Sequence, residues 1–358
     1  MIIIGSQNVK RVLIIQTAFI GDVILATPLV EAAHQAFPDC KVDFMVIPAA
    51  ANLLEKNPFV NRVLIFDKRG EQRGFGALWK LAKSLQREHY DLALVPHRSL
   101  RSALLVWLAK IPERIGFDRS AGNWFFTRRA PYQQKHEVER NLDLLRIFNN
   151  GIATSSPKIF WDKNDEQIVD QLVKNENDSK WFCALTPGSV WATKRWPAQR
   201  FIELAKRLIA ETGAFIYLIG GSSDRELCAS IAAAINENCI NTAGKLTLRQ
   251  SAALLDRCQI LVSNDSAPTH LGVATRCKVI TIFGPTVPAF GFAPFGEGHV
   301  VIEKNLPCRP CSSHGGNRCP IGTHACMWEI AVEEVFARVG IAKWRPKHNQ
   351  SKIFEVTK

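Results

Sequence analysis

Short apolar runs alternate along the chain with stretches in which apolar residues recur every three or four positions. The runs are typical of buried strands, and the recurring stretches predict amphipathic helices. Buried strands separated by helices indicate parallel sheets covered on both faces. In the first half, the pattern predicts strands at 12–15, 42–47, 62–66, 92–96, 114–117 and 124–127, and helices at 28–37, 74–88, 99–109 and 136–148.

The polar, turn-rich stretch 149–180 separates this pattern from a second one. With 358 residues, the chain is comfortable as two domains of ordinary size. We expect an α/β protein with an N-terminal domain over 1–172, a second domain over 173–345 and a tail over 346–358. Two doubly wound domains facing across a cleft are the economical architecture. The second pattern predicts strands at 182–186, 215–219, 260–263 and 278–283, and helices at 198–210, 223–236, 247–257 and 267–275.

The net charge of +12 favours an anionic partner. Nucleic acid is a poor candidate, because the charges are spread and no aromatic-and-basic RNA motif occurs. The chain has no long uncharged apolar run and no signal-peptide pattern, so we expect a cytoplasmic protein.

Five polar segments follow predicted strands, and four of them lie in the second half. In "TPGSVWATKRWP", Gly188 and Ser189 offer backbone N–H groups and a hydroxyl, while Lys194 and Arg195 offer charge. Phosphate oxygens need both. The alternative is an ordinary strand-to-helix turn with two solvated bases and Trp196 packed on the core.

"SNDSAPTH" ends a buried strand and opens a helix. Asp265 and Ser266 are good N-caps, and the free N–H groups near Ala267 suit an anion. Asp265 could also accept hydrogen bonds from sugar hydroxyls. His270 taken alone is more often a packed core histidine. A weaker signal of the same kind is "FGPT", with Gly284 and Thr286 at a strand end.

The loop "QTAFIGDVILATP" has the layout of a phosphate-binding loop but places Asp22 directly after its single glycine, Gly21. A carboxylate is a poor neighbour for a phosphate. Asp22 either caps a short helical turn or stabilises the helix N-terminus through its charge, or it takes part in the chemistry of the site. Thr27 and Pro28 then form a second helix start with proline at the first helical position, or a kink in one longer helix.

Four of the ten cysteines cluster in the pattern C-x2-C-x7-C-x6-C, and the other six are scattered. This spacing is compatible with a zinc site, but also with reduced thiols that stabilise a loop. We predict no metal. The cluster consists of Cys308, Cys311, Cys319 and Cys326.

Taken together, these segments resemble the lipopolysaccharide heptosyltransferases of glycosyltransferase family 9. The matching pieces run in order from residue 11 to about 330, and the cysteine cluster is most similar to members that add the second inner-core heptose. The pieces are "RVLIIQTAFIGDVILATPLVEAAH", "VNRVLIFDKRG", "RIGF", "TPGSVWATKRWPAQRFIELAKRL", "SNDSAPTHLGVA", "FGPTVP" and "CRPCSSHGGNRCPIGTHACM".

The resemblance implies a GT-B fold, two Rossmann-like domains facing across a cleft. It implies that the second domain binds ADP-heptose, that the first binds the lipid A–core acceptor, and that the transfer is inverting and needs no metal or other cofactor. The family's catalytic aspartate falls on Asp22, and its donor-site residues fall on Lys194, Asp265 and His270. Where some members have a ribose-binding glutamate, this chain has Ser222 and Ser223.

Two arginines that follow an N-domain strand, Arg98 and Arg101, could pair with acidic groups of the acceptor. The alternative is a solvated face with Ser99 as a helix cap. The basic charge would suit peripheral contact with an anionic inner membrane. Two other functions stay open: another GT-B transferase of cell-envelope glycan, and a non-catalytic nucleotide-binding protein. A dehydrogenase is disfavoured because no G-x-G-x-x-G follows a strand.

Overall fold

Two parallel sheets of six strands each form the centre of the molecule. The structure is a computed structural model and describes residues 9–173 and 181–341. The first sheet has the order β3-β2-β1-β4-β5-β6, and the second has the order β12-β11-β10-β7-β8-β9. The first contains β1 (Arg11–Gln16), β2 (Lys41–Val46), β3 (Arg62–Ile65), β4 (Leu92–Val95), β5 (Glu113–Phe117) and β6 (Arg128–Ala130). The second contains β7 (Trp181–Thr186), β8 (Ala214–Leu218), β9 (Cys239–Asn241), β10 (Ile260–Asn264), β11 (Lys278–Phe283) and β12 (Val300–Glu303).

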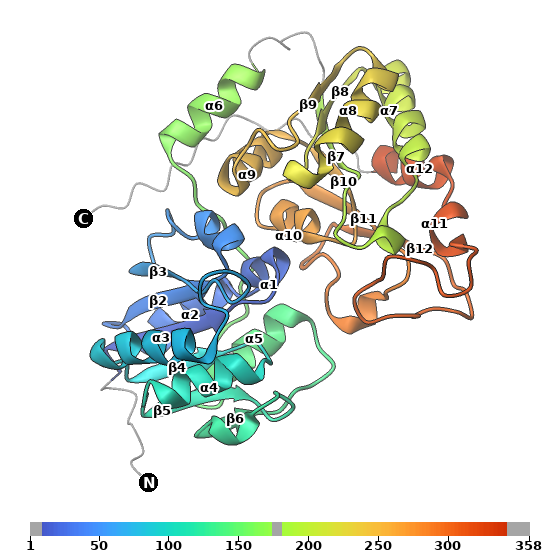
Figure 1. Ribbon diagram of the computed structural model, residues 1–358. Helices are drawn as coiled ribbons and strands as arrows, with labels where there is room; N and C mark the ends of the chain where they lie inside the picture. The colour runs from blue at the N-terminus through green and yellow to red at the C-terminus, as the bar shows by residue number, and fades with distance from the viewer. Residues whose placement is uncertain (1–8, 174–180, 342–358) are drawn as a thin grey trace.

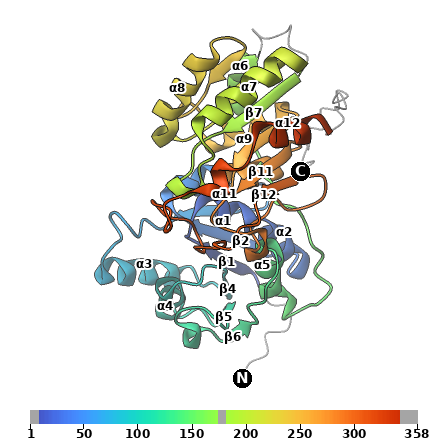
Figure 2. The same cartoon turned by 90° about the vertical axis from the view of Figure 1, so that its right-hand side faces the viewer.

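Helices connect the strands and cover both sheets, as Figures 1 and 2 show. The central strands are buried on both faces, which is why they read as unbroken apolar runs. With the first sheet lie α1 (Ile20–Leu25), α2 (Pro28–Ala36), η2 (Pro48–Leu53), α3 (Phe75–Arg87), α4 (Leu100–Leu108), η3 (Asn123–Phe125) and α5 (Glu137–Arg146). The rest are α6 (Lys163–Val173), η5 (Ala192–Lys194), α7 (Ala198–Thr212), η6 (Ser222–Asp224), α8 (Arg225–Ile235), α9 (Leu248–Arg257), α10 (Ala267–Val273), η7 (Pro288–Phe290), α11 (Ala325–Trp328) and α12 (Val332–Ile341).

The prediction of a strand at 124–127 was wrong. Residues 123–125 form the 3₁₀ turn η3, and the edge strand β6 follows at Arg128–Ala130. The apolar side chains there are explained by packing. Phe126 is buried against the backbone of Gly116 in β5, where an added Cβ would lie 2.1 Å from its ring. The other predicted strands correspond to observed ones within a few residues.

The pattern missed the short edge strands β9 and β12 and the helices α11 and α12. At the first loop, two helices are present, with Pro28 at the first position of α2. The Thr27 hydroxyl donates to the Ile24 carbonyl (2.8 Å) and makes no capping bond.

Part of the stretch expected to be turn-rich forms α6, which packs against α9 beside the second sheet. The division of the chain at 172/173 stays a prediction. The expected tail, 346–358, lies outside the described residues.

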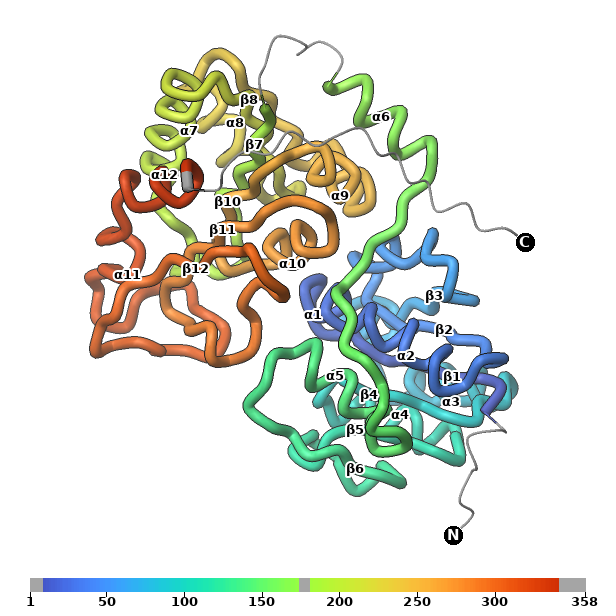
Figure 3. The backbone as a smooth tube through the Cα atoms, turned by 180° about the vertical axis from the view of Figure 1, so that it is seen from behind, coloured from blue at the N-terminus to red at the C-terminus, as the bar shows by residue number. Residues whose placement is uncertain are grey.

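The two halves touch where α1 packs against α10, with η2 against α9 to one side (Figure 3). On that side, the backbone N–H of Arg249 donates to Asn52 Oδ1 (3.0 Å). The Arg249 guanidinium donates to Asp165 (2.8 Å) and Glu55 (2.9 Å). No helix among residues 9–173 and 181–341 is long and apolar enough to cross a bilayer.

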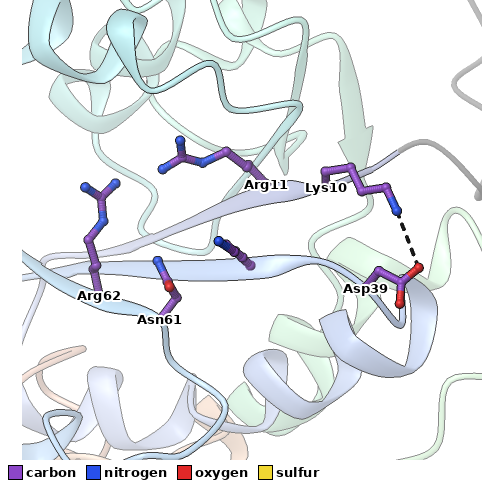
Figure 4. Close-up of a pocket in the computed structure, with 6 residues that line it drawn as sticks. Lys10, Arg11, Asp39, Asn61 and Arg62 are labelled. Atoms are coloured by element: carbon purple, nitrogen blue, oxygen red, sulfur yellow. Dashed lines mark hydrogen bonds and ion pairs between the residues drawn. The ribbon is translucent and has the colours of Figure 1, made fainter.

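A basic pocket of about 430 Å³ lies at the amino ends of β1, β2 and β3 (Figure 4). Its cations are largely paired with acids. Arg62 donates to Asp43 (2.6 Å) and Glu88 (3.0 Å), and Arg11 donates to Glu88 (2.7 Å). These bonds lower the pKa of Glu88 to about 2. The pocket is therefore mainly an ion-pair network that holds the strand starts together.

Candidate active site

The two sheets have the same strand order. In each sheet, the first and the fourth strand of that half lie side by side, and the connections on the two sides of this pair run in opposite directions. In such sheets, ligands bind outside the carboxyl ends of the strands at this switch point. The first sheet switches between β1 and β4, which are followed by Asp22 and Arg98. The second switches between β7 and β10, which are followed by Lys194 and Asp265. The predicted site residues thus stand at both switch points, on the edge opposite the basic pocket of Figure 4.

The contact between α1 and α10 brings the two switch points together. Gly21 of α1 packs against the ring of His270 of α10, and a Cβ at Gly21 would lie 2.9 Å from His270 Cδ2. The position therefore has room only for glycine. Asp22 follows directly, so this close approach sets the catalytic candidate of one half beside the other half.

Asp22 is partly exposed and occupies the first turn of α1. Its Oδ2 accepts a hydrogen bond from the N–H of Phe19 at 3.2 Å, so it does contribute to the helix start. Burial raises its pKa, whereas the Phe19 N–H, the His314 ring and the Arg140 guanidinium lower it. The raised pKa makes the carboxylate a stronger base than an exposed aspartate.

Three loops of the second half converge on Asp265. Lys194 Nζ and Thr286 Oγ1 each lie 2.6 Å from Asp265 Oδ2. All three are largely buried, and they come from the ends of β7, β10 and β11. Asp265 therefore holds the ammonium group of Lys194, where the sequence suggested a helix cap.

Ser266 stands at the N-cap position of α10, followed by Ala267, but its side chain makes no capping bond. His270 is buried, and burial lowers its pKa to about 3, so the ring is neutral. Its Nδ1 has no hydrogen-bond partner among the described residues. His270 thus packs at the domain contact and also presents a free ring nitrogen there.

The glycine loop after β7 is held by its neighbours. Asn264 accepts from the Trp196 N–H (2.9 Å) and donates to the Pro187 carbonyl (2.9 Å). Arg195 donates to the carbonyl of Ser189, at 2.9 Å from Nε and 2.7 Å from Nη2. Arg195 therefore fixes the loop instead of presenting a free charge to a phosphate.

Next to this loop, the carboxylate of Asp224 lies against Gly188, where a Cβ would be 2.2 Å from its Oδ1. Asp224 also accepts the N–H of Gly221 (2.9 Å). Ser222 and Ser223 are exposed in η6. A carboxylate thus stands beside the glycine loop after β7 even though the sequence places serines after the glycines.

The segment with the cysteine cluster contacts the loops after β7 and β11. Gly316 and Thr193 exchange hydrogen bonds: the Thr193 N–H donates to the Gly316 carbonyl (3.0 Å), and the Gly316 N–H donates to Thr193 Oγ1 (2.8 Å). The His324 ring lies 2.7 Å from the Thr193 carbonyl. Arg309 donates to the carbonyls of Gly284 and Thr286.

The four clustered cysteines are free thiols. Over residues 9–173 and 181–341, no three or more His, Cys, Asp or Glu side chains are arranged to hold a metal ion. The contacts of the segment therefore support the interpretation of the cluster as part of a stabilised loop.

The two arginines proposed for the acceptor differ. Arg98 is exposed, with its guanidinium 4.2 Å from the ring centre of Tyr132. Arg101 donates to the carbonyls of Gln72 and Gly74 and lies over Phe66. Arg101 is thus occupied in holding the loop after β3. Ser99 makes no side-chain capping bond.

Four charged or titratable residues near Asp22 were missed by sequence reasoning: Lys68, Glu137, Arg140 and His314. Lys68 lies in a segment quoted for the resemblance, after β3. His314 lies within the cysteine cluster. The signal that could have found Lys68 was its place after a strand of the first sheet; Glu137 and Arg140 lie on a helix and carry no such signal.

Comparison with known proteins identifies the family. The family model described as glycosyltransferase family 9 (heptosyltransferase) matches residues 78–318. Lipopolysaccharide heptosyltransferase 2 of Salmonella typhimurium is 28% identical over 300 residues, covering 78% of this chain and 84% of that protein. Lipopolysaccharide heptosyltransferase 1 of Pseudomonas aeruginosa is 29% identical over 315 residues, covering 84% and 86%.

The fold is that of solved members of the same family. The structure of ADP-heptose lps heptosyltransferase II of E. coli superposes with a TM-score of 0.77 at 24% identity, covering 93% of this chain and 98% of that one. The two Rossmann-like halves therefore make a GT-B fold, as the resemblance implied. Because the family model spans more than half of the sequence, this chain belongs to glycosyltransferase family 9, the heptosyltransferases.

Proposed function

We propose that this glycosyltransferase moves heptose from ADP-L-glycero-D-manno-heptose to the inner core of lipopolysaccharide, placing the second heptose on the first. The donor and the acceptor class follow the names of its relatives. The cysteine-rich segment, most similar to members that add the second heptose, favours that position. The observation that carries the proposal is the α1–α10 contact. It packs the helix that carries Asp22 against the helix that begins just after Asp265, the residue that binds Lys194.

We infer an inverting, metal-independent transfer with Asp22 as general base. The acceptor hydroxyl oxygen forms a bond to the anomeric carbon, and its proton passes to the Asp22 carboxylate. The bond from that carbon to the diphosphate breaks on the opposite face, and its electron pair leaves with ADP. The environment of Asp22 supports this role, because burial raises its pKa toward the working range of a base.

Lys194 is the proposed source of positive charge at the departing diphosphate. Its buried ammonium group is fixed by Asp265, which Thr286 also holds, so its position needs little reorganisation during the reaction. Gly188 and Ser189 would offer backbone N–H groups to the same oxygens. Ser266, Ala267, His270 and Gly284 complete the proposed donor site, and Arg98 and Lys68 face the acceptor side.

We further propose that the first domain contacts an anionic membrane from the inner face. Five large apolar side chains are exposed on α3, α4 and η3, which contact one another in turn. Exposed Lys80 and Lys83 share α3 with them, and Lys83 Nζ lies 5.4 Å from the ring centre of Trp79. Aromatic and basic side chains together suit an anionic bilayer surface. This aromatic patch consists of Phe75, Trp79, Leu100, Trp107 and Trp124.

Mass spectrometry of reaction products tests the substrate assignment. With ADP-heptose, we expect a heptose to be added to a core acceptor that already carries the first heptose, and not to an acceptor that carries none. Addition to the heptose-free acceptor alone would show that the enzyme adds the first heptose. Donor binding with no transfer to any core acceptor would favour another glycan substrate or a non-catalytic role.

Asp22→Asn should abolish turnover while keeping the fold. The amide oxygen can still accept the Phe19 N–H, so thermal unfolding and ADP-heptose affinity should stay near wild type. An amide cannot take the proton, so we expect kcat to fall by about 10²–10⁴-fold. Asp39→Asn, at the far edge of the sheet, is the matched control. Near-normal transfer by Asp22→Asn would leave Asp22 as a helix-start residue only.

Lys194→Ala should lower kcat and raise KM for ADP-heptose, because the lost charge acts on the diphosphate in both the bound and the transition state. Lys206→Ala, which removes an exposed lysine from α7, should change neither. A change confined to the acceptor KM would place this loop on the other substrate.

Trp79→Ser combined with Trp107→Ser should weaken membrane contact several-fold without loss of transfer to a detergent-solubilised acceptor. The measurement is co-sedimentation with vesicles that contain phosphatidylglycerol, compared with pure phosphatidylcholine vesicles. Trp328→Ser, at an exposed tryptophan of the second domain, is the control. Equal sedimentation of wild type and double variant with the anionic vesicles would contradict the proposed surface.

A further inference from the structure

The first turn of α5 docks on the second domain through its backbone and side chains. The N–H of Glu137 donates to the Gly291 carbonyl at 2.8 Å, and Arg140 Nη2 donates to the Phe290 carbonyl at 2.9 Å. The His136 ring nitrogen Nε2 donates to the Ala293 carbonyl at 2.8 Å, because that oxygen can only accept. Three carbonyl groups of segment 290–293 therefore accept hydrogen bonds from the start of α5.

Arg140 is the centre of this contact. It is almost completely buried, and Nε and Nη2 lie 2.8 and 2.6 Å from Glu137 Oε2. Its guanidinium lies 4.9 Å from the ring centre of Tyr132 and 5.6 Å from that of Phe292. The ion pair with Glu137, the carbonyl and the two rings together fix the position of the guanidinium charge. The Phe290 carbonyl and the Phe292 ring belong to the second domain.

Gly291 is required for this arrangement. Its φ is +91°, and a Cβ there would lie 2.3 Å from the Lys135 carbonyl oxygen and 2.8 Å from Arg140 Nη2. Only glycine lets the segment approach α5 so closely. The location of the Arg140 charge thus depends on the docking of the two halves.

Helix α5, which carries Arg140, packs on α1, which carries Asp22. The charge of Arg140 lowers the pKa of Asp22, which burial raises. Burial raises the pKa of Glu137 to about 7, and the charge of Asp22 adds to that rise. The other groups around Asp22 are Lys68 after β3, His314 of the cysteine-rich segment and neutral His270 of α10, while η2 contributes no titratable side chain.

We propose that Arg140 is a positioning residue that keeps Asp22 ionised in the docked state, and that Glu137 and the Phe290 carbonyl hold it there. Docking of the second domain removes water from Asp22, which by itself favours the protonated, inactive carboxyl. The same docking fixes a guanidinium beside it, and the positive charge offsets that effect. The base is therefore ready at the moment the two halves close. This inference rests on the proposed role of Asp22.

Arg140→Gln tests the inference through the pH profile of kcat/KM, measured with ADP-heptose and the core acceptor on which the wild type turns over. Without the cation the pKa of Asp22 rises, so less carboxylate exists at low pH. The acid limb should move to higher pH by about half a unit or more, with a several-fold greater loss at pH 6 than at pH 8.5. Arg140→Lys keeps the charge and should restore part of the shift.

Arg146→Gln is the matched control. Arg146 lies on the same helix and pairs with Glu139 (2.6 Å) and Asp143 (3.1 Å) without facing Asp22. Arg146→Gln should lower thermal stability and leave the acid limb of the kcat/KM profile in place.

A second readout needs no turnover. Carboxyl ¹³C NMR titration, with Asp22 assigned by the signal missing in Asp22→Asn, should give a higher pKa for Asp22 in Arg140→Gln than in the wild type. An unmoved acid limb and an unmoved titration in Arg140→Gln would overturn the inference while leaving an inactive Asp22→Asn, and with it the base, intact. A fully active Asp22→Asn would instead remove the base itself.

Discussion

The close approach of Gly21 to the His270 ring is the constraint on which the site depends. A side chain at position 21 would push α1 away from α10. Asp22 would then stand in the first domain with nothing opposite it. Each half alone has only part of the chemistry: a carboxylate at one switch point, and an anchored lysine at the other. The close packing at Gly21 joins these parts. Polar contacts between the halves at Arg249 and at α5 lie on either side of it.

Much of the fold was predictable because the central strands are buried and therefore carry an unbroken apolar signal. Three of the four edge strands were not predictable for the same reason. Strands β6, β9 and β12 are short and partly exposed, so their residues have no such pattern. The apolar residues around Phe126 indicated a strand but serve packing against Gly116. The alternation of strands and helices thus predicts two helix-covered parallel sheets, but it does not predict most of the edge strands.

The residues of the candidate site could be found from sequence, but the contacts between them could not. Asp22, Lys194 and Asp265 could be found from sequence because each follows a strand, and strand ends in parallel sheets collect functional residues. The bond between Lys194 and Asp265 spans 71 residues, and Arg140 reaches the Phe290 carbonyl across 150 residues. The first pairing depends on the order of strands within one sheet, and the second depends on how the two halves are placed; local patterns contain neither. The sequence suggested Asp265 as a cap or a donor-site residue and Arg101 as an acceptor ligand or a solvated charge, but it did not predict the contacts that both make within the protein.

The identical strand order of the two sheets bears on how such enzymes diversify. Each half offers its own set of loops at its own switch point, on a scaffold of buried strands. Loops of one half can therefore change length and chemistry while those of the other half stay as they are. Selection on the two sets of loops then acts on separate stretches of sequence. Changes in either set of loops must preserve the small contacts at α1, α5 and η2, where the halves meet.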